Sequence, residues 1–187
     1  MARIAPVTPE NVNSKSEQLL QGVEKALGVR PNMLRAMGQS PAVLGAYVGF
    51  GQALGGASIS GALREQIALT VAGVNSCDYC ASAHTLLGKG AGVEEGELAD
   101  NLRGASSDAK TAAALAFAAS IVNKKGFVSD ADLASVREAG YGDAEIAEIV
   151  ATVAVNIFTN YFNHVAQTEI DFPHVDAGET AAAAAAL

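Results

Sequence analysis

The sequence has no tryptophan, only two cysteines and few charged side chains, which make up 17% of its 187 residues. Half of the residues are hydrophobic, and this balance excludes an intrinsically disordered chain and favours a compact, well-buried protein. A chain of this length can bury a substantial core without covalent support. The two cysteines are therefore not needed as a disulfide to hold the fold.

Basic residues are also scarce. The twelve lysines and arginines face twenty acidic residues, which gives a formal net charge of −8, and they are scattered along the chain. Because phosphate binding needs a clustered basic footprint, we expect no nucleic-acid partner. Small molecules or proteins are the expected partners, and the low charged fraction also favours contacts between copies of this chain.

No hydrophobic run approaches the ~18 residues that a membrane span needs. The first residues, MARIAPVTPENVNSKSEQ, contain no apolar segment typical of a secretory signal. We therefore expect a cytoplasmic protein with no membrane partner. In that compartment paired cysteines are more often catalytic or metal-binding than structural.

No stretch shows the alternating, β-branched pattern of a strand. Instead, Ser or Asp precedes several segments of helical periodicity, and glycines such as Gly92 and Gly104 separate them. We expect an all-α bundle of about eight helices. We expect a single domain over residues 1–175. Residues 176–187 form a low-complexity, alanine-rich tail to which we assign no function. The clearest expected helices cover residues 14–27, 61–74, 94–102, 108–123, 129–139 and 143–164.

Both cysteines and one of the three histidines lie within eight positions, in the segment VNSCDYCASAHTLLGKG. Asn75 or Ser76 is suited to cap a helix, so Cys77 and Cys80 should occupy its first turn. The spacings of three and four residues place both thiols and His84 on one helix face. The helix dipole favours a thiolate there, and His84 is placed to take its proton. The pattern indicates a reactive thiol pair in which one cysteine resolves the oxidised other as a disulfide.

Two other interpretations of this segment remain. A structural zinc site usually takes four protein ligands, whereas Cys77, Cys80 and His84 supply three, and no second CxxC or histidine pair follows. Two small thiols packed in a helical core beside a satisfied histidine would need no chemistry at all. A thioredoxin-like site is excluded, because its CxxC follows a strand in a βαβ unit that this sequence lacks.

A carboxylate extends the motif. Glu65 in REQIAL precedes Cys77 by twelve positions, which gives Glu-x11-Cys-x-x-Cys-x3-His with Cys80 and His84. This pattern resembles the signature of the AhpD-like alkylhydroperoxidases within the carboxymuconolactone decarboxylase superfamily. The flanking segments VRPNMLRAMGQSPAVL and NIFTNYFNHVAQTEIDFP are similar to the peroxidase-related branch, so the resemblance covers roughly residues 28–173.

The resemblance implies an all-helical, AhpD-like bundle that assembles as a homo-oligomer, a dimer, trimer or hexamer. It implies that a hydroperoxide oxidises Cys80 to a sulfenic acid and that Cys77 is the proton donor and resolving thiol. Glu65 and His84 would form the proton relay that ionises Cys80, directly or through a water. A dithiol or a protein would supply electrons, and neither a cofactor nor a metal is expected.

One position departs from the pattern. Well-known members carry a histidine just before the second cysteine, where this chain has Tyr79. A tyrosine hydroxyl titrates near pH ~10, so it does not replace a histidine base at neutral pH. Other functions stay open: a thiol-disulfide reductase serving another peroxidase, a carboxymuconolactone decarboxylase-like enzyme, and a non-catalytic helical oligomer. The cysteine pair counts against the decarboxylase, whose reaction needs none.

His164 stands nineteen residues after Glu145, the same separation as between the glutamate and histidine of the motif. The positions that would match the cysteines are Ile157 and Asn160. A second copy of the motif would therefore have lost its thiols, and we interpret His164 as a structural residue.

Overall fold

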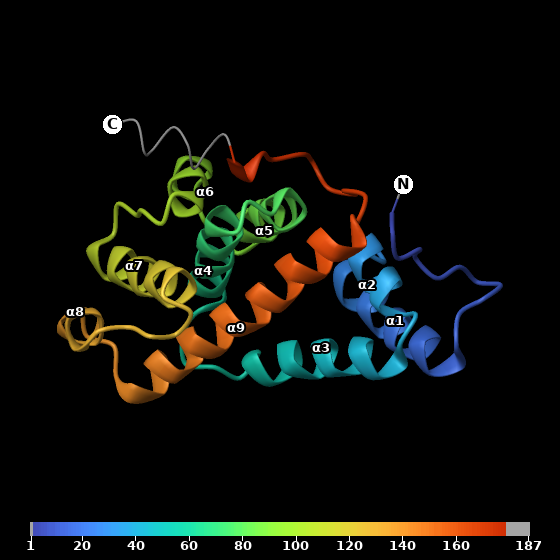
Figure 1. The fold of residues 1–187 in the computed structure, drawn as a ribbon, viewed down its shortest axis with the longest axis horizontal. Helices are drawn as coiled ribbons and strands as arrows, with labels where there is room; N and C mark the ends of the chain where they lie inside the picture. Colours follow the sequence, from blue (N-terminus) through green and yellow to red (C-terminus); the bar gives the residue numbers. More distant parts are fainter. Residues whose placement is uncertain (1, 179–187) are drawn as a thin grey trace. The chain divides into compact units, whose positions relative to one another are not determined.

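The computed structural model describes residues 2–178, which fold into nine helices with no strand (Figure 1). The prediction of an all-α protein is confirmed. Among the described residues, no helix combines the length and apolar character that crossing a membrane requires. The helices are α1 (Ser14–Leu27), α2 (Asn32–Met37), α3 (Pro41–Leu54), α4 (Gly61–Val74), α5 (Asp78–Gly90), α6 (Glu95–Leu102), α7 (Ala109–Asn123), α8 (Asp130–Glu138) and α9 (Asp143–Ala166).

The described residues divide into two compact units. Unit 1 comprises residues 2–56 and 161–171, and unit 2 comprises residues 57–160 and 172–178. Helix α9 contributes its first part to unit 2 and its end to unit 1. All four residues of the motif belong to unit 2.

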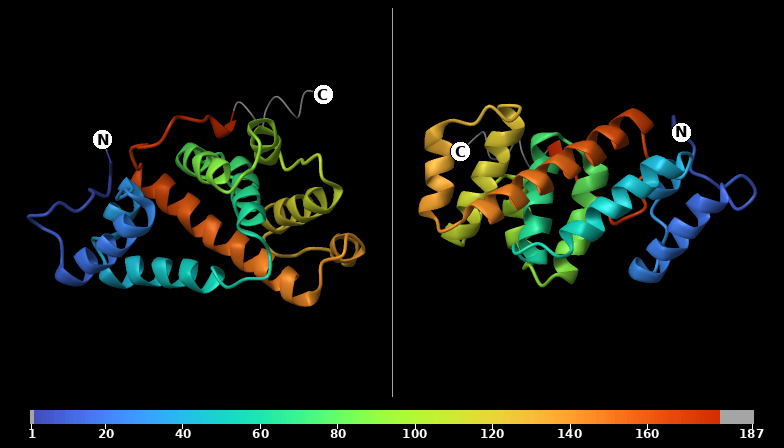
Figure 2. Two further views of the ribbon diagram at one scale, coloured as in Figure 1. Left: turned by 180° about the vertical axis from the view of Figure 1, so that it is seen from behind. Right: turned by 90° about the horizontal axis from the view of Figure 1, so that it is seen from below.

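Helix α4 is the centre of unit 2, where it packs against α5, α6 and α7, and α8 packs on α7 (Figure 2). Its cap is local: the Ser60 hydroxyl accepts a hydrogen bond from the Leu63 N–H at 3.1 Å. A Cβ at Gly73 would lie 1.9 Å from the Leu102 carbonyl oxygen, so only glycine lets α4 approach the end of α6 so closely. Buried core residues from α4, α7 and α9 include Ile67, Val71, Leu115, Ile149 and Val153.

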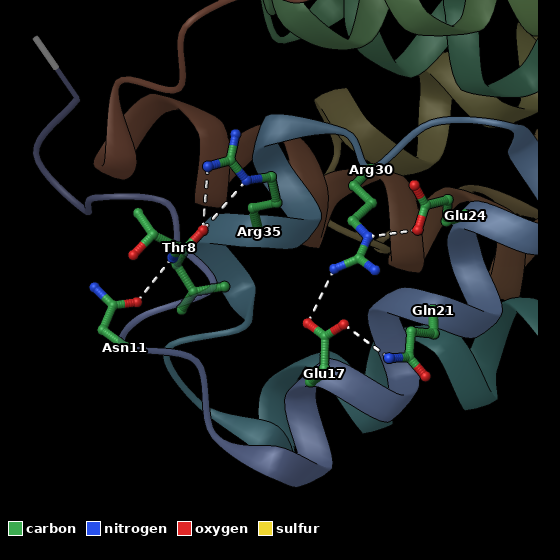
Figure 3. Close-up of polar contacts among 8 residues, drawn as sticks. Thr8, Asn11, Glu17, Gln21, Glu24, Arg30 and Arg35 are labelled. Atoms are coloured by element: carbon green, nitrogen blue, oxygen red, sulfur yellow. Dashed lines mark hydrogen bonds and ion pairs between the residues drawn. The ribbon is translucent and has the colours of Figure 1, made fainter.

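In unit 1, α3 packs against α1 and α2. Arg30 pairs with both Glu17 and Glu24 of α1, at 2.9 and 2.7 Å, and Arg35 donates to the Val7 carbonyl (Figure 3). These residues line a cavity of about 730 Å³. The two arginines already have partners within the chain, so their positive charges are balanced by Glu17 and Glu24 or held by a backbone carbonyl. None of the motif residues lines this cavity.

Candidate active site

The cysteines are positioned by a sharp reversal between α4 and α5. Ser76 takes a left-handed conformation, with φ of 52°, and α5 begins at Asp78 with Cys77 as its N-cap residue. The prediction that Asn75 or Ser76 caps this helix is wrong, because Cys77 has the extended backbone that the N-cap position requires. Cys80 remains in the first turn, as expected, and Cys77 lies immediately before it.

Both cysteines are free thiols with only 2% of their surface exposed. The Cys80 Sγ donates a hydrogen bond to the Thr159 hydroxyl oxygen at 3.8 Å. A hydrogen bond with the Cys80 sulfur raises the pKa of Cys77 well above the usual thiol range, and burial adds to the effect. Cys77 is therefore the thiol that keeps its proton. Its hydrogen bond to the Cys80 sulfur favours the thiolate form of Cys80.

Glu65 on α4 and His84 on α5 meet beside the thiols. The Glu65 Oε2 lies 2.7 Å from the His84 Nδ1, and the two side chains are 24% and 18% exposed. Burial by itself lowers the pKa of His84, but the charge and hydrogen bond of Glu65 and the charge of Cys80 raise it on balance. The carboxylate thus orients the imidazole and favours its protonated form.

Helix α9 supplies two polar residues that the sequence analysis missed. Asn156 is hydrogen-bonded to His84 through its side chain, and its Nδ2 donates to the Thr152 carbonyl at 2.9 Å. Thr159, one turn further along, contacts Cys80. Together with Thr152, these two residues are less than 7% exposed, and buried polar groups persist where they have partners. Their spacing of four and three residues on an otherwise apolar helix was the available signal.

The segment 172–178 covers the first turns of α5. The Tyr79 ring packs edge-on against Phe172, with centroids 5.5 Å apart and an interplanar angle of 84°. Backbone N–H groups of this segment donate to α5 side chains: Val175 to the Ser82 hydroxyl at 2.9 Å and Ala177 to the Asp78 carboxylate at 3.0 Å. Of the tail expected at 176–187, residues 179–187 lie outside the described residues.

The Glu145 and His164 pair does not form a second site. Glu145 lies in the part of α9 that belongs to unit 2, and His164 lies in the part that belongs to unit 1. Glu145 accepts the Gly142 N–H at 2.8 Å near the start of α9, and His164 is exposed. These two residues therefore belong to different units, whereas Glu65 and His84 meet within unit 2.

Within residues 2–178, no group of three or more His, Cys, Asp or Glu side chains is arranged to hold a metal ion. We predict that purified reduced protein contains well under one zinc per chain and that a chelator leaves its helical circular dichroism unchanged. Metal in a structural site stabilises the fold directly, so its removal would unfold the chain. Stoichiometric zinc whose loss causes unfolding would contradict a redox role for the thiols.

Known proteins share this arrangement of helices and the segment that carries the motif. Residues 41–119 match the carboxymuconolactone decarboxylase family, and the matched segment contains all four residues of the motif. Over that segment the chain is similar to this family. No curated protein matches it.

Several solved structures share the fold of this chain. An alkylhydroperoxidase AhpD core, a peroxidase-related protein from Ralstonia eutropha JMP134, superposes with a TM-score of 0.81 at 21% identity, over 91% of this chain and 92% of that one. A peroxidase-related protein from Silicibacter sp. TM1040 gives 0.79 at 23% identity, with 89% of each chain covered. The debrominase Bmp8, crystallised as a cysteine-to-alanine variant with 2,3,4-tribromopyrrole, gives 0.76 at 22% identity, over 90% and 91%.

Proposed function

We propose that this protein is a thiol-dependent peroxidase that reduces organic hydroperoxides through a Cys77–Cys80 dithiol and disulfide cycle. The observation that carries the proposal is the meeting, in unit 2, of two hydrogen-bonded thiols with the Glu65–His84 pair. A nucleophilic thiol needs a lowered pKa, a base and a resolving partner. The Glu65–His84 pair supplies the base, Cys77 supplies the resolving thiol, and the hydrogen bond between the two sulfurs favours the thiolate form of Cys80.

The proposed chemistry has three balanced steps. The Cys80 thiolate attacks the terminal peroxide oxygen, the O–O bond breaks, and the alkoxide leaves with a proton as the alcohol, which oxidises Cys80 to a sulfenic acid. Cys77 then attacks the sulfenic sulfur, water leaves, and the disulfide forms. An external dithiol, or a protein carrying one, returns two electrons and two protons to the pair.

The Glu65–His84 pair would serve the first step. His84 receives the Cys80 proton, directly or through a water, and Glu65 stabilises the imidazolium that results. The same proton can later go to the leaving alkoxide. Cys77, whose raised pKa keeps it protonated during this step, is the resolving thiol of the second step.

The fold shared with a debrominase supports a second candidate. Reductive debromination also consumes a dithiol: the carbon–bromine bond is replaced by carbon–hydrogen, two thiols become one disulfide, and hydrogen bromide is released. A thiol-disulfide reductase would pass the same two electrons to another disulfide. The three functions therefore share the cysteine pair and differ in the electron acceptor.

Steady-state turnover separates them. The reduced protein is supplied with dithiothreitol and either cumene hydroperoxide, 2,3,4-tribromopyrrole or a small cyclic disulfide. We expect alcohol formation from the hydroperoxide to exceed the rate of dithiothreitol alone by orders of magnitude, with no comparable bromide release. Bromide release or disulfide reduction without alcohol formation would replace the peroxidase assignment.

A further inference from the structure

Thr159 stands in an unusual position for a helical threonine, because its hydroxyl connects the second cysteine of the motif to α9. The residue is 3% exposed. Its oxygen accepts the hydrogen bond from Cys80 at 3.8 Å and donates its own hydrogen to the Asn156 carbonyl at 3.0 Å. The sulfur and the carbonyl therefore meet at one rotatable hydroxyl.

This arrangement suits the neutral thiol only. A thiolate has no hydrogen to donate and needs donors, whereas a hydroxyl carries one hydrogen and two lone pairs. Rotation about the Thr159 Cβ–Oγ bond moves that hydrogen from the Asn156 carbonyl to the Cys80 sulfur without displacing either side chain. The carbonyl that gives up the bond is a helix carbonyl, which has the N–H four residues later as a partner.

We propose that Thr159 is a positioning residue that stabilises the Cys80 thiolate by reversing the direction of this hydrogen bond. A hydrogen bond to the charged form of a group lowers its pKa, and such bonds are stronger than neutral ones. The inference rests on the proposed function in one respect: it takes Cys80 to be the reacting thiol.

Asn156 links this hydroxyl to the proton relay. Its backbone carbonyl receives the Thr159 hydrogen, and its side chain is hydrogen-bonded to His84. When the proton leaves Cys80 for His84, the hydroxyl can turn toward the sulfur while Asn156 continues to hold the imidazole. One turn of α9 thus contacts both the proposed proton donor, Cys80, through Thr159 and the proposed acceptor, His84, through Asn156.

The same helix offers a matched control. Thr152 is 2% exposed, and its hydroxyl donates to the Glu148 carbonyl at 2.8 Å, one turn back on the helix. A Thr→Val change there removes an equally buried hydroxyl whose hydrogen bond goes to a helix carbonyl rather than to Cys80.

The test is the pH profile of Cys80 alkylation by iodoacetamide, with peptide mass spectrometry to locate the label. In Thr159→Val we expect the pKa of Cys80 to rise by about one unit, which is about tenfold slower labelling at neutral pH. Thr159→Ser should keep the parent profile, and so should Thr152→Val. If Thr159→Val does not fold, Thr159→Ala against Thr159→Ser makes the same comparison with one oxygen changed.

An unchanged pH profile in the variants that lack the hydroxyl would overturn the inference, and so would an equal shift in Thr152→Val. Alkylation needs no peroxide, so this result is independent of the proposed activity. A raised pKa in a protein that consumes no hydroperoxide would support Thr159 and reject the peroxidase. Hydroperoxide consumption with an unshifted pKa of Cys80 would support the peroxidase and reject the role of Thr159.

Discussion

Cys80→Ser should abolish hydroperoxide consumption, with a loss of about a thousandfold or more, because a serine hydroxyl is neither ionised at neutral pH nor oxidised by peroxide. Cys77→Ser should behave differently. It keeps the attacking sulfur and removes the resolving one, so one equivalent of hydroperoxide should leave a sulfenic acid on Cys80. Dimedone trapping with peptide mass spectrometry measures this product.

The two variants also test the order of the thiols. Cys77 lies just before α5 with a raised pKa, and Cys80 lies within its first turn beside Thr159. The serine variants differ only in which sulfur remains, and each is the other's control. Sulfenic acid on Cys77 in Cys80→Ser, with turnover retained, would reverse the assignment.

Loss of the proton relay should have the next largest effect. Glu65→Gln or His84→Ala should raise the pKa of Cys80 and slow peroxide reduction at neutral pH by about a hundredfold. Residues that act as a unit are strongly non-additive, so the double variant should be little worse than the poorer single one. The pH profile of alkylation measures the pKa, and stopped-flow peroxide reduction measures the rate.

A residual depression of the Cys80 pKa should persist in every relay variant, because the N-terminus of α5 remains. If both single variants alkylate with the parent's pH profile, the helix alone sets the thiolate, and Glu65 and His84 are structural.

The same pair predicts a pH dependence of stability. Glu65 raises the pKa of His84, so its stabilisation is full below the ordinary histidine value of about 6.5 and is lost as the pH rises through the higher folded value. The difference in free energy of unfolding between parent and Glu65→Gln should therefore be largest near about pH 6 and shrink at higher pH. Urea denaturation at several pH values measures it.

Features set by neighbouring residues could be predicted from the sequence. Ser60, Asp108 and Ser129 cap their helices because each side chain reaches a backbone N–H within three residues. Gly104 and Gly140 end helical segments in left-handed conformations, at φ of 72° and 90°. These signals sufficed for the all-α class and for most helix limits.

Features that depend on tertiary packing could not be predicted from the sequence. Thr159 and Cys80 are 79 residues apart, and no local rule pairs a threonine with a cysteine at that separation. The left-handed Ser76 moved the α5 cap to Cys77, although a non-glycine residue at positive φ is uncommon and carries no sequence signal. The contact of Phe172 with Tyr79 depends in the same way on tertiary structure.

Tyr79 also changes the surroundings of the thiols. In place of a titratable histidine, the chain has a ring that is 4% exposed and packed against Phe172. The proton relay proposed for Cys80 would then have His84 and Glu65 as its titratable members, with no contribution from position 79. This makes the first oxidation event the most direct observation of the proposed chemistry.

The decisive measurement is therefore a single turnover of the reduced protein with one equivalent of cumene hydroperoxide, without external reductant. We expect rapid loss of both thiols of each chain and formation of one alcohol per chain, with a Cys77–Cys80 disulfide in the peptide map. Thiols that stay reduced at neutral pH while the one equivalent of hydroperoxide persists would contradict the proposed cycle.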